Sequence, residues 1–119
     1  MMTLRRSGLI ILTLLLPGCS ELGMCKEESL SSRDSPDGRY WAEIVSADCA
    51  ATSPARWVVL HQAEGTFKGH KTVAVFDDSA GDANISVRWE DETHLVIRAR
   101  GAKPWSFSPN WHGVHVADR

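Results

Sequence analysis

The 119-residue sequence has no apolar segment long enough to cross a bilayer and no excess of basic residues. Its longest apolar run, residues 9–16, is far shorter than the roughly 20 residues that a helix needs to span a hydrocarbon core of about 30 Å. With 13 Lys and Arg against 15 Asp and Glu, the chain also lacks the basic stripe typical of nucleic-acid binding. These absences argue against a transmembrane helix in this run and against a nucleic-acid partner.

The sequence also lacks an assembled catalytic or metal-binding motif. No serine lies in a G-x-S-x-G context, and no nucleophile, base and orienting group stand together. His112 and His115 lie in one expected strand, where a spacing of three puts them on opposite faces and prevents joint chelation. The acidic residues Asp77, Asp78 and Asp82 lack the EF-hand spacing that calcium requires. We therefore predict no catalytic residue, no metal site and no cofactor, and we do not expect an enzyme.

The N-terminus, by contrast, carries a recognisable targeting pattern. Two arginines precede the apolar run 9–16, which has the length of a signal-peptide h-region, and Gly18 and Cys19 close it. This arrangement resembles the lipobox of bacterial lipoproteins. The resemblance implies cleavage of residues 1–18 as a signal peptide and lipid attachment to the Cys19 sulfur. An ordinary secretory signal with a chance cysteine is the alternative.

Lipid on Cys19 would hold the protein at a membrane without a transmembrane segment. Each buried methylene contributes about 0.8 kcal/mol, and two or more acyl chains make a stable anchor. Ser20, not Asp, follows Cys19, which in a Gram-negative cell resembles the default sorting signal for the periplasmic face of the outer membrane. The mature chain keeps 11 of the 13 basic residues and all 15 acidic ones, for a net charge near −4. The expected partners are the membrane, through this lipid, and an envelope protein.

Two further cysteines, Cys25 and Cys49, remain in the mature chain. An even pair in an oxidising compartment most simply forms a disulfide, with a free thiol or a metal pair as the alternatives. Closing a loop of about 24 residues would stabilise the fold by roughly 3 kcal/mol. Residues 19–35 are polar and show little apolar periodicity, so we interpret them as a lipidated tether. Residues 36–119 are then expected to form one small β domain.

Short apolar segments separated by turn residues fill that domain. The clearest is a hairpin over 84–90 and 93–100, where apolar and polar residues alternate and place one row in the core. Segment 56–62 is apolar on both faces, as is typical of a central strand. No stretch shows a sustained helical period. We therefore predict an all-β fold, an antiparallel meander or open barrel-like sheet, with about six strands at 39–47, 56–62, 71–77, 84–90, 93–100 and 111–117.

Motifs spread over the mature chain resemble a family of small bacterial envelope proteins, often lipoproteins, that has no established activity. The family pattern is an early Cys, S-P-[DN]-G-[KR]-Y, C-[GA]-A-T and a late V-x-W-x-[DN]-x-x-x-L hairpin. Here these are Cys25 and residues 35–40, 49–52 and 87–95, with Ala50 where Gly is commoner. The resemblance supports the disulfide and the small β domain and implies no catalytic residue.

The C-terminal segment gathers Trp105, Phe107 and Trp111 within seven residues. Trp is favoured at interaction hot spots and at membrane interfaces, so these three are the candidate binding residues. Alternatively, the rings close one end of the core. We expect a lipid-anchored envelope protein that acts as a small structural or binding module. The second hypothesis is an inhibitor of a secreted hydrolase, a lysozyme or protease, that presents residues 101–109 as a rigid loop.

Overall fold

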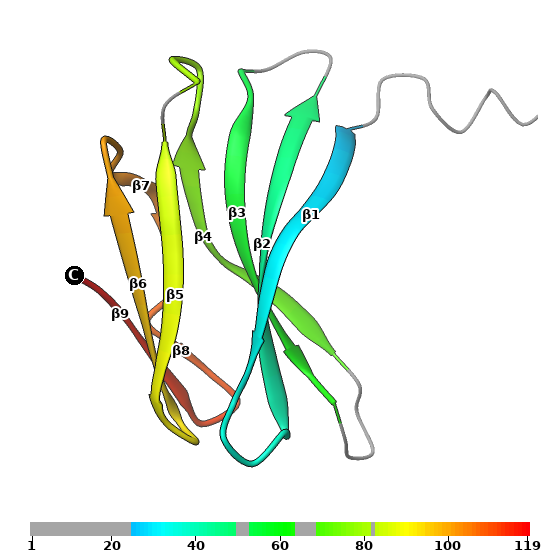
Figure 1. Ribbon diagram of the computed structural model, residues 1–119, viewed down its shortest axis with the longest axis vertical. Helices are drawn as coiled ribbons and strands as arrows, with labels where there is room; N and C mark the ends of the chain where they lie inside the picture. The colour runs from blue at the N-terminus through cyan, green and yellow to red at the C-terminus, as the bar shows by residue number, and fades with distance from the viewer. Residues whose placement is uncertain (1–24, 50–52, 64–68, 82) are drawn as a thin grey trace, which may run out of the picture.

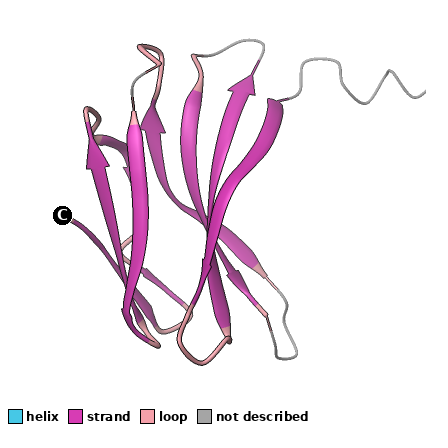
Figure 2. Cartoon of the chain, in the orientation of Figure 1, coloured by secondary structure: helices cyan, strands magenta, loops and turns pink. Residues whose placement is uncertain are grey.

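The computed structural model describes residues 25–49, 53–63, 69–81 and 83–119, and β-strand is the regular structure in all four ranges (Figure 1 and Figure 2). The predicted all-β class is confirmed. Among these residues there is no helix long and apolar enough to cross a membrane. The predicted signal peptide and Cys19 lie outside the described residues.

The strands form two sheets that pack face to face. The first sheet is antiparallel, and its strands lie in the order β1 (Cys25–Asp34), β2 (Tyr40–Cys49), β3 (Ala55–Gln62), β4 (His70–Asp77) and β7 (Pro104–Phe107). The second sheet has the order β5 (Asn84–Asp91), β6 (His94–Arg100), β9 (Val114–Asp118) and β8 (Asn110–Trp111), with β6 and β9 parallel. The chain changes sheet after β4, returns for β7 and changes again for β8. The domain is therefore a two-layer sandwich, with more strands than the six expected, instead of one curled sheet.

One hydrophobic core lies between the two sheets. Phe76 and Leu60 of the first sheet and Leu95 and Ile97 of the second are completely buried within it. The period-two prediction for the hairpin is confirmed, because its apolar row joins this core: Ile85, Val87, Trp89, Leu95, Ile97 and Ala99. Full burial of a large apolar side chain contributes about 1.5–3 kcal/mol. This shared core is therefore the main force that holds the two layers together.

The first strand corrects the predicted tether. Cys25 pairs with Cys49 and Asp34 pairs with Trp41, so β1 lies along β2 as an edge strand of the first sheet. The Cys25–Cys49 disulfide is present and joins the two strands at one end, as predicted. The polar composition that suggested a linker is that of an edge strand, where charged side chains prevent pairing with other chains. Residues 25–34 of the 19–35 segment thus belong to the folded domain.

The turn between β1 and β2 is built by side-chain hydrogen bonds. The buried Ser35 hydroxyl donates to Asp37 Oδ1 at 2.8 Å and accepts from the backbone N–H of Tyr40 at 3.1 Å. This hydroxyl, followed by the Arg39 backbone N–H, lowers the pKa of Asp37. These hydrogen bonds close the turn at residues 35–38, where Gly38 has a φ of 73°.

The expected strand 111–117 is wrong, because a tight turn divides it into β8 and β9. His112 and Gly113 form this turn, and both have positive φ, 48° and 83°. That combination is typical of type I′ turns, whose twist matches that of two antiparallel strands. The hairpin returns the chain so that β9 lies beside β6.

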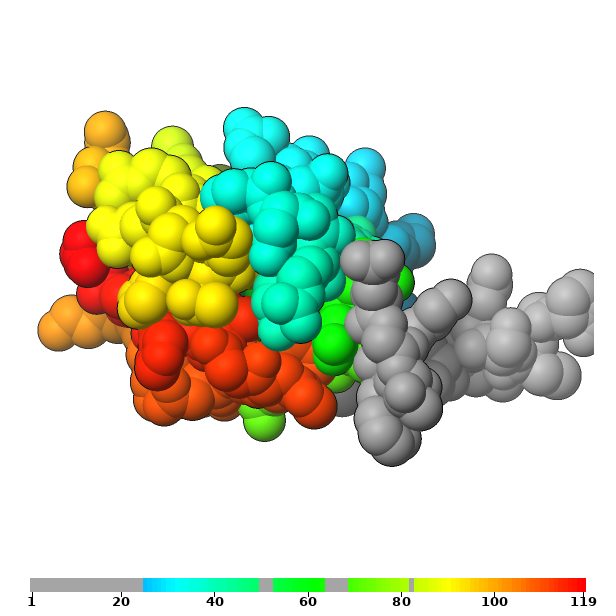
Figure 3. Space-filling view, turned by 90° about the horizontal axis from the view of Figure 1, so that it is seen from below, coloured from blue at the N-terminus to red at the C-terminus, as the bar shows by residue number. Residues whose placement is uncertain are grey.

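Two hydrogen bonds join the sheets at the end where the β1–β2 and β5–β6 turns lie. The Trp89 indole N–H donates to the Arg33 carbonyl at 2.9 Å, and the Tyr40 hydroxyl donates to the His112 carbonyl at 3.1 Å. Figure 3 looks onto this end and shows the two turns and the C-terminal hairpin gathered together. The disulfide lies at the opposite end of the first sheet, so the two ends are fastened by different means.

Candidate functional site

The outer face of the first sheet, which points away from the second sheet, carries large apolar side chains. In the strand register, Val45 lies opposite Trp57, Trp57 opposite Val75, and Val75 opposite Ser106. This row therefore crosses β2, β3, β4 and β7. Because side chains alternate along a strand, the neighbouring Phe76 enters the core while Val75 stays on the outer face.

Trp105 joins this row through a β-bulge. Ser106 pairs with Val75 and Pro104 pairs with Phe76, so Trp105 is an extra residue in β7. A bulge of this kind re-aims a side chain relative to the regular alternation. Trp105 and Ser106 accordingly line the same hollow, whereas Phe107 packs against the core. In a regular strand without the bulge, Trp105 would point to the same inner side of the sheet as Phe107, because the two residues are two positions apart.

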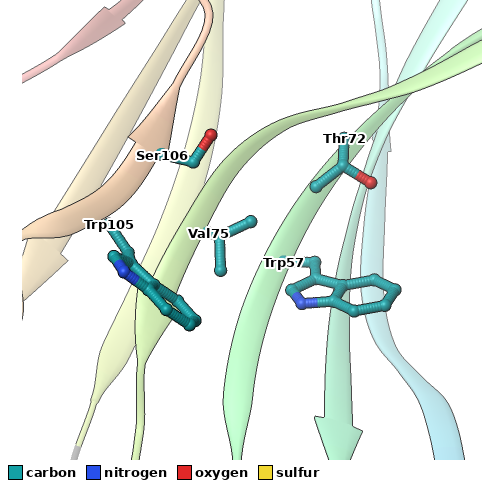
Figure 4. A pocket seen from close by; sticks show the side chains of 5 residues that line it. All are labelled: Trp57, Thr72, Val75, Trp105 and Ser106. Carbon is teal, nitrogen blue, oxygen red and sulfur yellow. The ribbon is translucent and has the colours of Figure 1, made fainter. Parts of the chain in front are cut away.

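A shallow groove of about 480 Å³, open to solvent, lies on this face. It is lined by Trp57, Thr72, Val75, Trp105 and Ser106. We call it the Trp57–Trp105 groove. Figure 4 shows the two indoles on either side of Val75, one from β3 and one from β7. Trp105 is 72% exposed. Its indole therefore adds exposed apolar surface next to Trp57 and Val75, which makes this groove the candidate site.

A second hollow adjoins the first on the other side of Trp105. It is lined by Ser53, Asp77, Lys103 and Trp105. Trp105 therefore separates a groove with apolar and hydroxyl side chains from a hollow with one acidic and one basic side chain. The indole offers surface to both.

Another aromatic row lies on the same face of the sheet, further along the strands. Trp41 stacks on His61 with ring centroids 4.5 Å apart and planes within 4°, and His70 lies 5.6 Å beyond. Glu43 Oε1 is 2.9 Å from His61 Nε2. A hydrogen bond from Ser29, followed by His61, lowers the pKa of Glu43. The polar groups of this row thus contact one another, and none of its three aromatic side chains lines the groove.

The structure separates the three predicted binding residues. Trp105 lies exposed in the groove, whereas Phe107 and Trp111 pack against the core. The alternative, in which the rings close the core, therefore holds for two of the three. Sequence reasoning missed Trp57 and Val75, although a signal was present. Segment 56–62 is apolar on both faces, and only one of those faces is needed for the core.

The histidines do not assemble a metal site in the part of the chain that the structure describes, where no group of three or more metal-binding side chains occurs. His94 and His115 come together on the second sheet, with ring centroids 4.9 Å apart, and Asp91 Oδ1 lies 2.8 Å from His94 Nδ1. The backbone N–H of Thr93, followed by His94, lowers the pKa of Asp91. His112, in contrast, lies in the β8–β9 turn.

No protein-family model, curated protein or solved structure matches this chain. The resemblance to envelope lipoproteins therefore stays a prediction. A sandwich fold alone does not define a function, because unrelated functions share such folds. The functional argument therefore starts from the Trp57–Trp105 groove.

Proposed function

We propose that the protein is a lipid-anchored module of the bacterial envelope that binds another envelope component through the outer face of its first sheet. The supporting observation is the Trp57–Trp105 groove, where a largely exposed indole stands beside a second one on a paired sheet. Trp residues of this kind dominate the energetics of binding surfaces. The sheet supplies rigidity, so little conformational freedom is lost on binding.

The position of the proposed anchor fits a tethered module. Cys19 stands six positions before Cys25, the first residue of β1. A chain of this length reaches at most about 20 Å. The disulfide fastens β1 to β2 directly after that short segment, so lipid on Cys19 would hold the whole domain near the bilayer surface.

The hydrolase-inhibitor hypothesis loses its main structural element. It requires residues 101–109 to protrude as a rigid loop. Instead, Pro104–Phe107 forms β7 and pairs with β4. The segment contributes a groove wall instead of a projecting loop, which favours the binding-module function.

The test is site-specific photo-crosslinking in living cells. A photoreactive amino acid replaces Trp105 in one variant and Arg98, on the outer face of the second sheet, in the control. We expect adducts from position 105 and not from position 98. Adducts are scored as a shifted band or as retention with the insoluble cell wall after detergent extraction.

Adducts at neither position, or equally at both, would contradict the proposed binding surface. The anchor is tested separately by feeding cells an alkyne-tagged fatty acid. The wild type should incorporate the label, and Cys19→Ala with an ordinary secretory leader should not. Label on both proteins would overturn the lipidation of Cys19.

A further inference from the structure

The two indoles of the Trp57–Trp105 groove are spaced for a ligand with a repeat. Trp57 lies on β3 and Trp105 on β7, with β4 and Val75 between them. Neighbouring strands lie about 4.8 Å apart, so the two strands are separated by about 10 Å. A β-linked glycan is a nearly straight chain, and its disaccharide repeat is about as long as this distance. A sugar ring and the next ring but one are therefore spaced like the two strands.

From this spacing and the chemistry of the lining, we infer that the groove binds a β-linked glycan strand, with sugar rings stacked on Trp57 and Trp105. This inference rests on the proposed function and names the ligand of the same site. A pyranose ring has an apolar face of C–H bonds. The electron-rich face of an indole attracts these weakly positive hydrogens and covers them from water.

The polar side chains around the indoles suit the other part of a sugar, its hydroxyl rim. Thr72 and Ser106 stand at the border of this groove, whose exposed lining is almost entirely apolar, and their hydroxyl groups can both donate and accept hydrogen bonds. Beyond Trp105, the adjoining hollow adds Asp77 as an acceptor and Lys103 as a donor. An apolar floor with a few polar groups at its border is the usual composition of a small-ligand site.

The charges of this region match a neutral ligand. The side chains that line the groove are uncharged, and the adjoining hollow carries one negative charge at Asp77 and one positive charge at Lys103. An anionic lipid surface would favour an excess of Lys or Arg. The mature chain instead has a net charge near −4. The uncharged sugar backbone of the cell wall has the required chemistry and is within the same compartment as the proposed anchor.

The test uses the complete mature chain without its lipid, as Cys19→Ala secreted from a cleavable leader. The protein is sedimented with chitin, an uncharged β-linked N-acetylglucosamine polymer, and with purified cell-wall sacculi. Titration with soluble chitin oligosaccharides, followed by tryptophan fluorescence, gives the dissociation constant. We expect binding to strengthen most from the disaccharide to the trisaccharide, because the first and third rings lie one disaccharide repeat apart and can then stack on the two indoles.

The variants Trp105→Ala and Trp57→Ala should each weaken glycan binding by about tenfold or more. Trp105→Phe should retain part of the affinity, since it keeps an aromatic face. Arg98→Ala, on the other sheet, is the matched control and should bind as the parent does. Thermal melting of each variant identifies any loss that arises from unfolding, and Trp105 is exposed enough that its substitution should leave the fold intact.

Three results would overturn the inference. The first is no sedimentation with chitin or sacculi and no fluorescence change at millimolar oligosaccharide, with the protein folded. The second is glycan binding that survives both Trp→Ala variants. The third is binding to phosphatidylethanolamine–phosphatidylglycerol vesicles that Trp105→Ala abolishes, without any glycan binding, which would assign the groove to a lipid surface. Adducts from position 105 in cells would still support the proposed function in each case.

Discussion

The outer faces of the two sheets differ sharply, although the same alternation of side chains generates both. The outer face of the first sheet carries Trp41, which stacks on His61, and the two groove residues Trp57 and Trp105. The second presents charged residues such as Arg88 and Arg98. Both sheets bury their inner faces in one core. The shared core accounts for the inner faces only, so the aromatic character of the first outer face needs a separate explanation, and the proposed binding function supplies one.

The ion pairs on the second sheet support this contrast. Arg119 lies 3.1 Å from Glu90, and Arg88 lies 3.5 Å from the same carboxylate. Exposed pairs of this kind contribute about 0–1 kcal/mol each. The ion pairs of the second outer face thus add little stability, whereas the first outer face exposes apolar surface that water disfavours.

The largest expected difference in stability is between substitutions on the inner and the outer side of β4. Phe76→Ala removes a completely buried ring from the core and should lower the free energy of unfolding by about 3–5 kcal/mol. Val75→Ala, one residue earlier on the outer face, should cost about 1 kcal/mol. Urea denaturation of both variants provides the comparison. Equal losses would show that the outer face is as important to the fold as the core.

The disulfide fastens only the first sheet, and its removal is the next largest effect. Cys25→Ser combined with Cys49→Ser should lower the free energy of unfolding by roughly 3 kcal/mol, because the unfolded chain regains the entropy of an open loop. Amide hydrogen exchange should increase most in β1 and β2. Uniform acceleration across both sheets would mean that the sandwich unfolds only as a single unit.

Substitutions on the two outer faces should have only a small effect on the free energy of unfolding. Trp105→Ala and Arg98→Ala should each change the free energy of unfolding by no more than about 0.5 kcal/mol. They should differ in surface behaviour, because only Trp105→Ala removes exposed apolar area. Shorter retention on a hydrophobic-interaction column for Trp105→Ala alone is the expected measurement. A stability loss several times larger for Trp105→Ala would assign this ring a packing role.

The smallest effects concern a carboxylate on each outer face. Ser29→Ala should raise the pKa of Glu43 toward its ordinary value of 4.5, because the Ser29 hydrogen bond is the largest cause of the lowering. Thr93→Ala should leave the pKa of Asp91 low, because the backbone N–H of Thr93 remains. Side-chain carboxyl NMR during an acid titration measures both.

The sign of the pH dependence is the same for the two groups. Each pKa is lowered in the folded state, so each carboxylate contributes its full stabilisation above the ordinary values of 4.5 for Glu43 and 3.8 for Asp91. That contribution is lost as the pH falls through the folded pKa. An unchanged Glu43 titration in Ser29→Ala would assign the lowering to His61 instead.

The sequence predicted those parts of the fold that depend on local pattern. Alternation in 84–90 and 93–100 correctly predicted the β5–β6 hairpin and its inward row, because a period of two fixes the faces of an amphipathic strand. The even cysteine pair likewise predicted the disulfide. The parallel contact of β6 with β9 escaped prediction, because no local pattern specifies which strands meet across the chain.

The candidate site escaped for a related reason. The groove depends on a bulge that turns Trp105 outward while Phe107 stays inward. In the sequence, the two residues have the spacing of side chains on one face. A register shift arises from pairing with β4, which the local sequence does not encode. Of the five residues that line the groove, Trp105 was the one predicted from the sequence; Trp57 lies near it only because β3, β4 and β7 are neighbours in the sheet.

Strand β7 also determines when the groove exists. The chain leaves the first sheet after β4 at Asp77, forms β5 and β6, and returns at Pro104 to complete the sheet. Contacts that close so long a loop form late, because the entropy of closure opposes them until the intervening segments have condensed. Trp57 is positioned with β3, but its counterpart arrives only with this returning strand. A chain that ends before Pro104 consequently lacks one wall of the groove, so the proposed binding surface is complete only when β7 has joined the first sheet.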